Sequence, residues 1–186
     1  MTTDCFTNDN SKTRRRKPNR LKYYDYSQNG SYFLTICSYN KQYLFWEEDS
    51  AIFPFQVQKL SKIGNIVESG ILNIDKHYPN VYVDNYVIMP NHVHLILTIQ
   101  NSIDKNDLIN STDVSNVIKQ FKGYASKKAG RVIWQKSFYD HVIRNEEDYL
   151  KIWEYIDNNP YRWKEDSLYC PLDDSYKKDD FSHCYT

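Results

Sequence analysis

The segment YVIMPNHVHLILTI, residues Tyr86–Ile99, decides the fold of this chain. It holds two runs of apolar and β-branched residues, and such runs are typical of buried strands. The dipeptide Pro90-Asn91 lies between them and is typical of a turn or break. The pattern therefore predicts two adjacent strands of an antiparallel sheet, over Asn80–Met89 and His92–Ile99.

The second of these strands carries two histidines that share one face. Residues i and i+2 of a strand point the same way, so His92 and His94 project together while Val93 and Leu95 point into the opposite layer. Two imidazoles side by side on a strand form half of a metal site. A pair of packed or solvated histidines is the ordinary alternative, and the rest of the chain must decide between the two.

Further strands and helices are predicted on both sides of this segment. Strand-like residues occupy Ser31–Ser38, Val132–Trp134 and Phe138–Val142, and helical apolar stripes run over about Gln58–Lys76, Ser111–Lys128 and Asn145–Asn158. The order is strand, helix, strand, strand, helix, strand, helix. This order predicts an α+β fold, with an antiparallel sheet and helices packed on one face.

The length of 186 residues suits one domain with extensions. We expect a flexible basic N-terminal arm over residues 1–22, a folded domain over 23–164 and a C-terminal tail over 165–186. No apolar run reaches membrane-spanning length, and no signal peptide is visible. The 4 cysteines are scattered, which favours free thiols in a reducing cytoplasm.

The formal net charge is +0, but the charge is unevenly distributed. The stretch KTRRRKPNRLK, residues 12–22, is rich in Lys and Arg and contains no acid, whereas the C-terminal tail carries pairs of acids. The arm is either a phosphate-binding extension or a solvated leader. The lysines of the helix over Ser111–Lys128 are open to the same two interpretations.

The third predicted helix has a polar site beside its apolar stripe. Asn145 is a good N-cap residue, and the acids after it favour the start of a helix. Tyr155 lies well off the stripe, and Asn159 lies four residues on, at its edge. The ordinary alternatives are a half-exposed tyrosine and a C-cap before Pro160. The apolar stripe itself consists of Tyr149, Ile152, Trp153 and Ile156.

These residues suit phosphoryl chemistry when they are combined. A tyrosine hydroxyl is a poor nucleophile at its usual pKa of about 10. A divalent cation would help by polarising a phosphoryl oxygen. The nitrogens of His92 and His94 with the amide oxygen of Asn159 give a three-ligand site with open positions, which suits catalysis.

The ordered set MPNHVHL, IWQ, FYDHVIRN and YIDNNP resembles the single-tyrosine HUH transposases, and specifically the REP-associated tyrosine transposases. The resemblance runs from about Tyr23 to Trp163. It implies a ferredoxin-like or RRM-like sheet whose central strand carries the histidine pair. It also implies cleavage and rejoining of single-stranded DNA at hairpin-forming repeats, through a 5′-phosphotyrosine intermediate.

The resemblance also implies a role for each site residue. Tyr155 would be the nucleophile, and His92, His94 and Asn159 would bind Mg²⁺ or Mn²⁺. Many family members have Gln where Asn159 stands, and Asn has a shorter reach by one methylene. The DNA would be held by the basic residues Arg14, Arg15, Arg16, Lys17, Lys119, Lys122, Lys127, Lys128 and Arg131.

The expected partners follow from the same resemblance. Transfer of the phosphodiester onto tyrosine needs no nucleotide cofactor, and the sequence has no P-loop motif. We expect a bacterial cytoplasmic protein, a monomer or homodimer, with no membrane partner. Three alternatives stay open: an RRM-type nucleic-acid-binding module, a domesticated transposase that no longer cuts, and a metal-dependent or two-histidine phosphoesterase. The remaining histidines, interpreted as structural or surface residues, are His77, His141 and His183.

Overall fold

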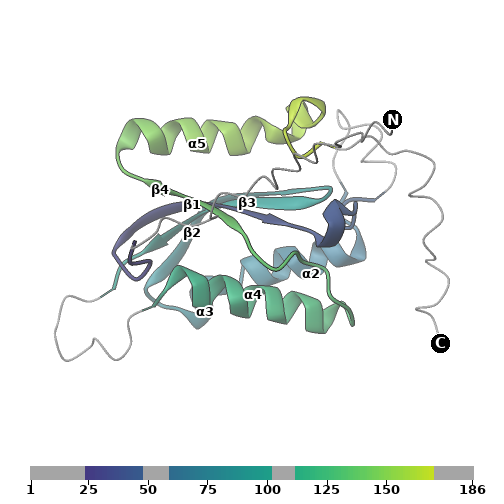
Figure 1. The fold of residues 1–186 in the computed structure, drawn as a ribbon, viewed down its shortest axis with the longest axis horizontal. Helices are drawn as coiled ribbons and strands as arrows, with labels where there is room; N and C mark the ends of the chain where they lie inside the picture. The colour runs from purple at the N-terminus through teal and green to yellow at the C-terminus, as the bar shows by residue number, and fades with distance from the viewer. Residues whose placement is uncertain (1–23, 48–58, 102–111, 170–186) are drawn as a thin grey trace, which may run out of the picture.

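The computed structural model describes residues 24–47, 59–101 and 112–169. Its centre is a four-stranded antiparallel sheet in the order β2-β3-β1-β4 (Figure 1). With the helices between its strands, this is the βαββαβ arrangement of the ferredoxin-like fold. The strands are β1 (Gly30–Cys37), β2 (Val81–Met89), β3 (His92–Ile99) and β4 (Tyr139–Ile143). The predicted α+β class and the antiparallel pair around Pro90-Asn91 are therefore confirmed.

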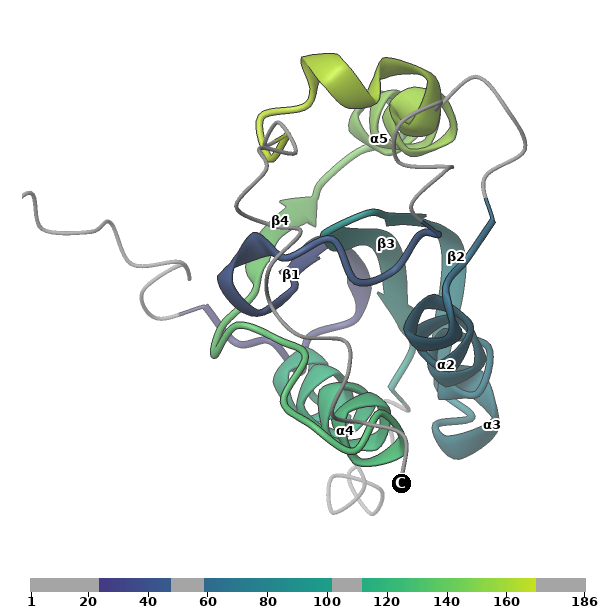
Figure 2. The same cartoon turned by 90° about the vertical axis from the view of Figure 1, so that its right-hand side faces the viewer.

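The helices occupy both faces of the sheet, not one as the sequence predicted. Figures 1 and 2 show α2, α3 and α4 against one face, and α5 with the 3₁₀ segment η3 across the other. The reason is that β3 is buried on both sides along most of its length, so each face needs a covering layer. The segments are α2 (Lys62–Ile71), α3 (Ile74–His77), α4 (Val114–Lys128), α5 (Glu146–Asn158) and η3 (Asn159–Glu165).

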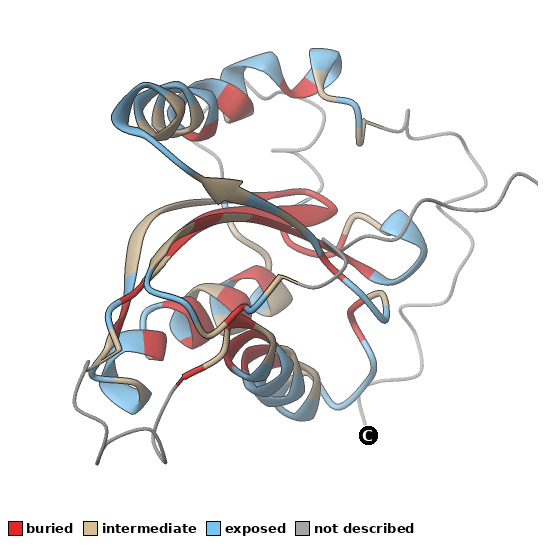
Figure 3. Cartoon of the chain, turned by 60° about the vertical axis from the view of Figure 1, so that its left-hand side comes forward, coloured by how far each residue is buried: buried red, intermediate tan, exposed pale blue. Residues whose placement is uncertain are grey.

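The main hydrophobic core lies between the sheet and the layer of α2 and α4. In β3, Val93 and Leu95 pair with Ile36 and Leu34 of β1, and all four side chains are buried in this core. Figure 3 shows the buried positions concentrated on the sheet and on the inner sides of these helices. The alternation that directs these residues into the core directs the two histidines of β3 toward α5.

Local sequence determines where α5 begins. The side chain of Asn145 accepts a hydrogen bond from the backbone N–H of Asp148 at 2.9 Å, as expected of an N-cap. Of the predicted apolar stripe, Ile156 is fully buried, and the other three members are half-buried. The helix lies along the sheet and contacts β2 and β3. This contact places the polar residues of α5 opposite the face of the sheet from which His92 and His94 project.

Other predictions for local structure differ in detail. The predicted helix over Gln58–Lys76 is divided into α2 and α3, and Val132–Trp134 forms only an isolated bridge, at Trp134. The basic arm over residues 1–22 and the tail beyond Tyr169 lie outside the described residues. Among the cysteines, Cys37 is free and buried. No helix in the described ranges is long and apolar enough to cross a membrane.

Candidate active site

The two histidines lie at the start of β3, next to the turn that joins it to β2. His92 is 0% exposed and His94 is 3% exposed. Their Nε2 atoms are 3.0 Å apart, so both rings direct the same nitrogen toward one point. The predicted pairing of these side chains on one face of a central strand is therefore present.

The tautomer of His92 follows from its neighbour. Asn91 donates through Nδ2 to the carbonyl oxygen of Leu168 at 3.0 Å, which fixes the orientation of its amide. Its Oδ1 therefore faces Nδ1 of His92, at 2.8 Å, and can only accept. His92 accordingly carries its proton on Nδ1, and Nε2 presents a lone pair.

The ring of His94 is held from two sides. Its Nδ1 lies 2.9 Å from the hydroxyl oxygen of Thr35, on the adjacent strand β1. A hydroxyl can donate or accept, so Thr35 accommodates either tautomer of His94. The ring of Phe33 stacks on the imidazole with a centroid separation of 5.1 Å. These contacts fix the plane of the ring and the direction of its Nε2.

Helix α5 places Tyr155 beside the histidine pair. The hydroxyl oxygen of Tyr155 lies 3.2 Å from Nε2 of His94, although 61 residues separate the two in sequence. The tyrosine is 43% exposed, and its ring meets Phe33 edge-on. The side chain is thus partly exposed, and its hydroxyl is directed at the imidazoles, as expected of the candidate nucleophile.

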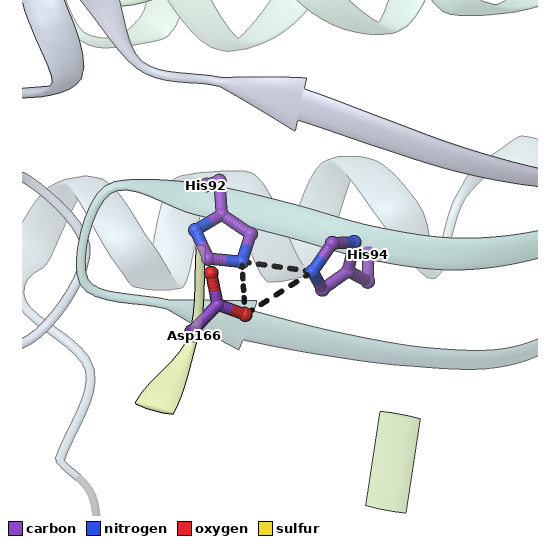
Figure 4. Close-up of side chains that lie close together, drawn as sticks. All are labelled: His92, His94 and Asp166. Carbon is purple, nitrogen blue, oxygen red and sulfur yellow. Dashed lines mark hydrogen bonds and ion pairs between the residues drawn. The ribbon is translucent and has the colours of Figure 1, made fainter. Parts of the chain in front are cut away.

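An acid from the predicted tail completes the cluster. The hydroxyl of Tyr155 donates to Oδ2 of Asp166 at 3.0 Å, and Nδ2 of Asn159 donates to the same oxygen at 3.0 Å. Oδ2 also lies 3.9 Å from Nε2 of each histidine. Figure 4 shows Asp166 and the two rings turned toward a common centre.

Burial and charge set the protonation states in this cluster. Burial lowers the pKa of His92 and of His94, so both are neutral at neutral pH. Burial and the charge of Asp166 raise the pKa of Tyr155 to about 12. Burial alone would raise the pKa of Asp166, but the contact with His94 and the hydrogen bonds from the Leu168 amide and Asn159 bring it below its usual value.

The donor atoms fit a divalent metal ion. One nitrogen from each histidine and one oxygen from Asp166 all lie within 4.8 Å of one another. The lone pair of His92 is directed into this space, and the Oδ1 atom of Asn159 is buried without a hydrogen-bond partner. A buried acceptor with no donor is costly unless a cation or solvent satisfies it. Imidazole and carboxylate are both ligands of such ions.

The basic residues predicted to bind DNA differ in how far they are exposed to solvent. Lys119, Lys127, Lys128 and Arg131 are exposed on and after α4. Lys122 is half-buried, and its ammonium donates to the carbonyl oxygens of Gln135 and Ser137. Lys122 therefore fastens α4 to the segment before β4. Arg14, Arg15, Arg16 and Lys17 lie outside the described residues.

Comparison with known proteins agrees with this arrangement. The family model "Transposase IS200 like" matches residues 58–159, which include both histidines, Tyr155 and Asn159. This chain belongs to the IS200-like transposase family. A Haemophilus influenzae protein without a functional name is 35% identical over 181 residues, covering 88% of this chain and 98% of that protein.

Within the family, the relatives indicate the REP-associated branch. The REP-associated tyrosine transposase of Escherichia coli K12 is 26% identical over 138 residues, covering 74% of this chain and 70% of that protein. A solved REP-associated tyrosine transposase bound to a REP hairpin has a TM-score of 0.55 at 22% identity, covering 80% and 74% of the two chains. That structural likeness supports the fold of this IS200-like transposase.

Sequence reasoning missed one residue of the cluster, Asp166. It lies just after η3, where the sequence predicts a tail because no periodicity continues beyond Lys164. The signal present in the sequence is the short apolar pair Leu168-Tyr169, which begins two residues after the acid. In the structure, Tyr169 packs edge-on against Trp163, and this contact holds the segment against the domain.

Proposed function

We propose that this transposase cuts and rejoins single-stranded DNA at hairpin-forming repeats, by metal-dependent transesterification through a 5′-phosphotyrosine. The observation that carries the proposal is the position of the Tyr155 hydroxyl, 3.2 Å from Nε2 of His94, on a side chain that is partly exposed. Relatives named REP-associated tyrosine transposases, one of them solved with a REP hairpin, support the choice of DNA.

The reaction exchanges one phosphodiester for another. The hydroxyl oxygen of Tyr155 bonds to phosphorus while the bond from phosphorus to the 3′ oxygen breaks. Tyr155 releases its proton to solvent, and the departing 3′ oxygen takes up a proton, so the proton count is unchanged. The products are a free 3′ hydroxyl and a strand linked through its 5′ phosphate to the tyrosine. Attack of a 3′ hydroxyl on this link reverses the step without a nucleotide cofactor.

The histidine face would hold the metal for this step. His92 and His94, with Asn159 as the third residue, would bind Mg²⁺ or Mn²⁺. When bound, such an ion polarises a phosphoryl oxygen and stabilises the charge of the transition state. Thr35 and Asn91 orient the two rings from behind, as outer residues do around metal-binding histidines.

Cations near the nucleophile would guide the DNA backbone. A pocket of about 410 Å³ lies in front of Tyr155, with Lys151 and Arg162 among the residues that line it. Lys41 is exposed and follows four residues after Cys37, which pairs with His92, so it lies near the histidine end of the sheet. Phosphate contacts of this kind supply much of the affinity of DNA-binding proteins. The exposed cations of α4 lie across the sheet from α5 (Figures 1 and 2) and would contact only DNA that extends around the sheet. We also propose that the N-terminal arm binds DNA, in a protein acting as a monomer or homodimer.

The test of the proposed function is covalent capture of DNA. Wild-type protein with Mn²⁺ and a labelled single-stranded hairpin should give an adduct that survives denaturation. Tyr155→Phe should abolish the adduct and retain hairpin binding. Tyr149→Phe is the matched control, because Tyr149 lies on the same helix but donates to Asp84 instead of facing the histidines.

Two outcomes would contradict the proposal. An adduct that persists in Tyr155→Phe and disappears in Tyr149→Phe would mean that Tyr149, and not Tyr155, is the nucleophile. Hairpin binding with no adduct in the wild-type protein would favour a nucleic-acid-binding module that performs no chemistry.

A further inference from the structure

We propose that Asp166 is a further, anionic ligand of this metal site, and that Asn159, the third residue of the proposed site, also orients the carboxylate of Asp166 through its Nδ2 atom. The inference rests on the proposed function, because it concerns the ion that the histidine pair would bind. It adds to the ligand set a residue that comes from outside both the histidine strand and the tyrosine helix.

The geometry brings one oxygen of Asp166 to the point that both histidines face. Its side chain is 1% exposed, and Oδ2 lies at the same distance, 3.9 Å, from each Nε2. Ligands at right angles around an ion with bonds of about 2.1 Å are about 3 Å apart. The two nitrogens already have this spacing, at 3.0 Å, and the oxygen needs to move by about 1 Å.

Charge gives an independent reason. In the described part of the chain, the cationic partners of the Asp166 carboxylate within ion-pair distance are limited to His92 and His94. An imidazole binds a metal ion as the neutral ring, so two imidazoles with an amide bring no negative charge to a dication, whereas a buried carboxylate is costly without a cation. A divalent ion would neutralise the buried carboxylate, and the carboxylate would supply the negative charge that the other ligands lack.

The hydrogen bonds of Asp166 resemble those of an oriented ligand. The backbone N–H of Leu168 donates to Oδ1 at 2.6 Å, and Nδ2 of Asn159 donates to Oδ2 at 3.0 Å. Such outer contacts fix a ligating carboxylate and tune the affinity of the ion. They direct Oδ2, the oxygen nearer the histidines, toward the metal position. The remaining oxygen of Asn159 is free to serve as a further ligand.

The donor set also discriminates between metals. Two histidines and one carboxylate form a facial set that leaves positions open for substrate oxygens. Mg²⁺ prefers oxygen ligands, whereas Mn²⁺ also accepts imidazole. We therefore expect the site to bind Mn²⁺ more tightly than Mg²⁺.

The test measures Mn²⁺ binding without DNA, by titration calorimetry on the full chain. Asp166→Asn preserves the shape of the side chain and removes its charge, and it should weaken Mn²⁺ binding about tenfold or more. Asp166→Glu should recover part of the affinity. Glu165→Gln is the matched control, because Glu165 is adjacent and acidic but pairs with Arg162. The Mn²⁺ affinity of this variant should stay within about twofold of that of the wild-type protein.

A second measurement covers the case in which Asp166→Asn does not fold. A crystal structure of the wild-type protein with Mn²⁺ should place the Oδ2 atom of Asp166 within about 2.4 Å of an ion that both histidines bind. The carboxylate of Asp148, which pairs with His141 instead, should make no contact with that ion. An ion bound by both histidines, with the Asp166 carboxylate more than about 3 Å away, would overturn the inference.

Failure here is distinguishable from failure of the proposed function. If Asp166→Asn binds Mn²⁺ as tightly as wild type while the Tyr155 adduct still forms, Asp166 is not a ligand and the transesterase stands. If wild type binds no Mn²⁺ and forms no adduct, both proposals are wrong. If Asp166→Asn cleaves DNA faster at unchanged Mn²⁺ affinity, Asp166 is not a ligand. The result would mean that its carboxylate competes with the scissile phosphate for the site.

Discussion

The two buried histidines should make the metal-free protein sensitive to mild acid. His92 and His94 have an ordinary pKa of 6.5 when unfolded, and burial lowers the folded value of each. The charge of Asp166 acts in the opposite direction but does not reverse the shift of either imidazole. The charge of a protonated His94, and then that of Lys41, add to the lowering of the pKa of His92, while Tyr155, Thr35 and Asn91 contribute only polar contacts.

The sign and size of the effect follow from proton linkage. Below its ordinary pKa, an unfolded imidazole binds a proton that the folded one refuses, so stability falls as the pH falls. If a folded histidine stays neutral, lowering the pH from about 7.5 to about 5.5 costs about 1.4 kcal/mol for that residue. The two together give an upper limit of about 2.7 kcal/mol, a large part of a typical domain stability.

The assay is urea unfolding of the chelator-treated protein across this pH range. Unperturbed carboxyl groups titrate below the window, at about pH 4, so they contribute little to the slope. His94→Gln should remove up to half of the pH dependence, because Gln does not titrate. His77→Gln is the control, since His77 is exposed at the end of α3 and lies outside the cluster.

A free energy of unfolding that does not depend on pH would contradict this prediction. Wild-type stability that does not change between about pH 7.5 and about pH 5.5 would mean that protons enter the folded cluster freely. An unchanged slope in His94→Gln would assign the pH dependence to other groups. Saturating Mn²⁺ should raise the stability of the wild-type protein at neutral pH and steepen its loss in acid, because protons compete with the ion.

Three further predictions concern the metal site, the packing of α2 and the binding of DNA. Thr35→Val removes the hydroxyl that faces His94 and should weaken Mn²⁺ binding about 10–100-fold, whereas Thr35→Ser should retain it, as calorimetry can measure. Gly64→Ala would place a methyl group against the carbonyl oxygen of Phe45 and should cost about 1–3 kcal/mol of unfolding free energy; Gly123→Ala, which meets nothing within 4 Å, should not destabilise the protein. Lys41→Ala should lower the salt dependence of single-stranded DNA binding by about 0.7 in log–log slope, measured by fluorescence anisotropy, whereas Lys76→Ala in α3 should leave it unchanged.

Local patterns in the sequence were sufficient for the four strands of the sheet, though not for Val132–Trp134, and for the shared direction of the two histidines. Side chains alternate along a strand whatever covers it, so His92 and His94 had to point the same way once β3 was recognised. The start of α5 is similarly local, because the Asn145 cap and the acids after it act within one turn. The position of Tyr155 off the apolar stripe followed from helical periodicity alone.

Tertiary structure decided what lies opposite those histidines. The layer to which α5 belongs depends on the burial of both faces of β3, which no single helix pattern encodes. Asp166 joins the cluster because η3 turns the chain back over the sheet and Tyr169 packs on Trp163. Contacts between segments far apart in sequence depend on how whole layers pack, whereas periodicity reports only on neighbours along the chain. For that reason the sequence indicated the histidines and the tyrosine, and only the folded chain placed the carboxylate between them.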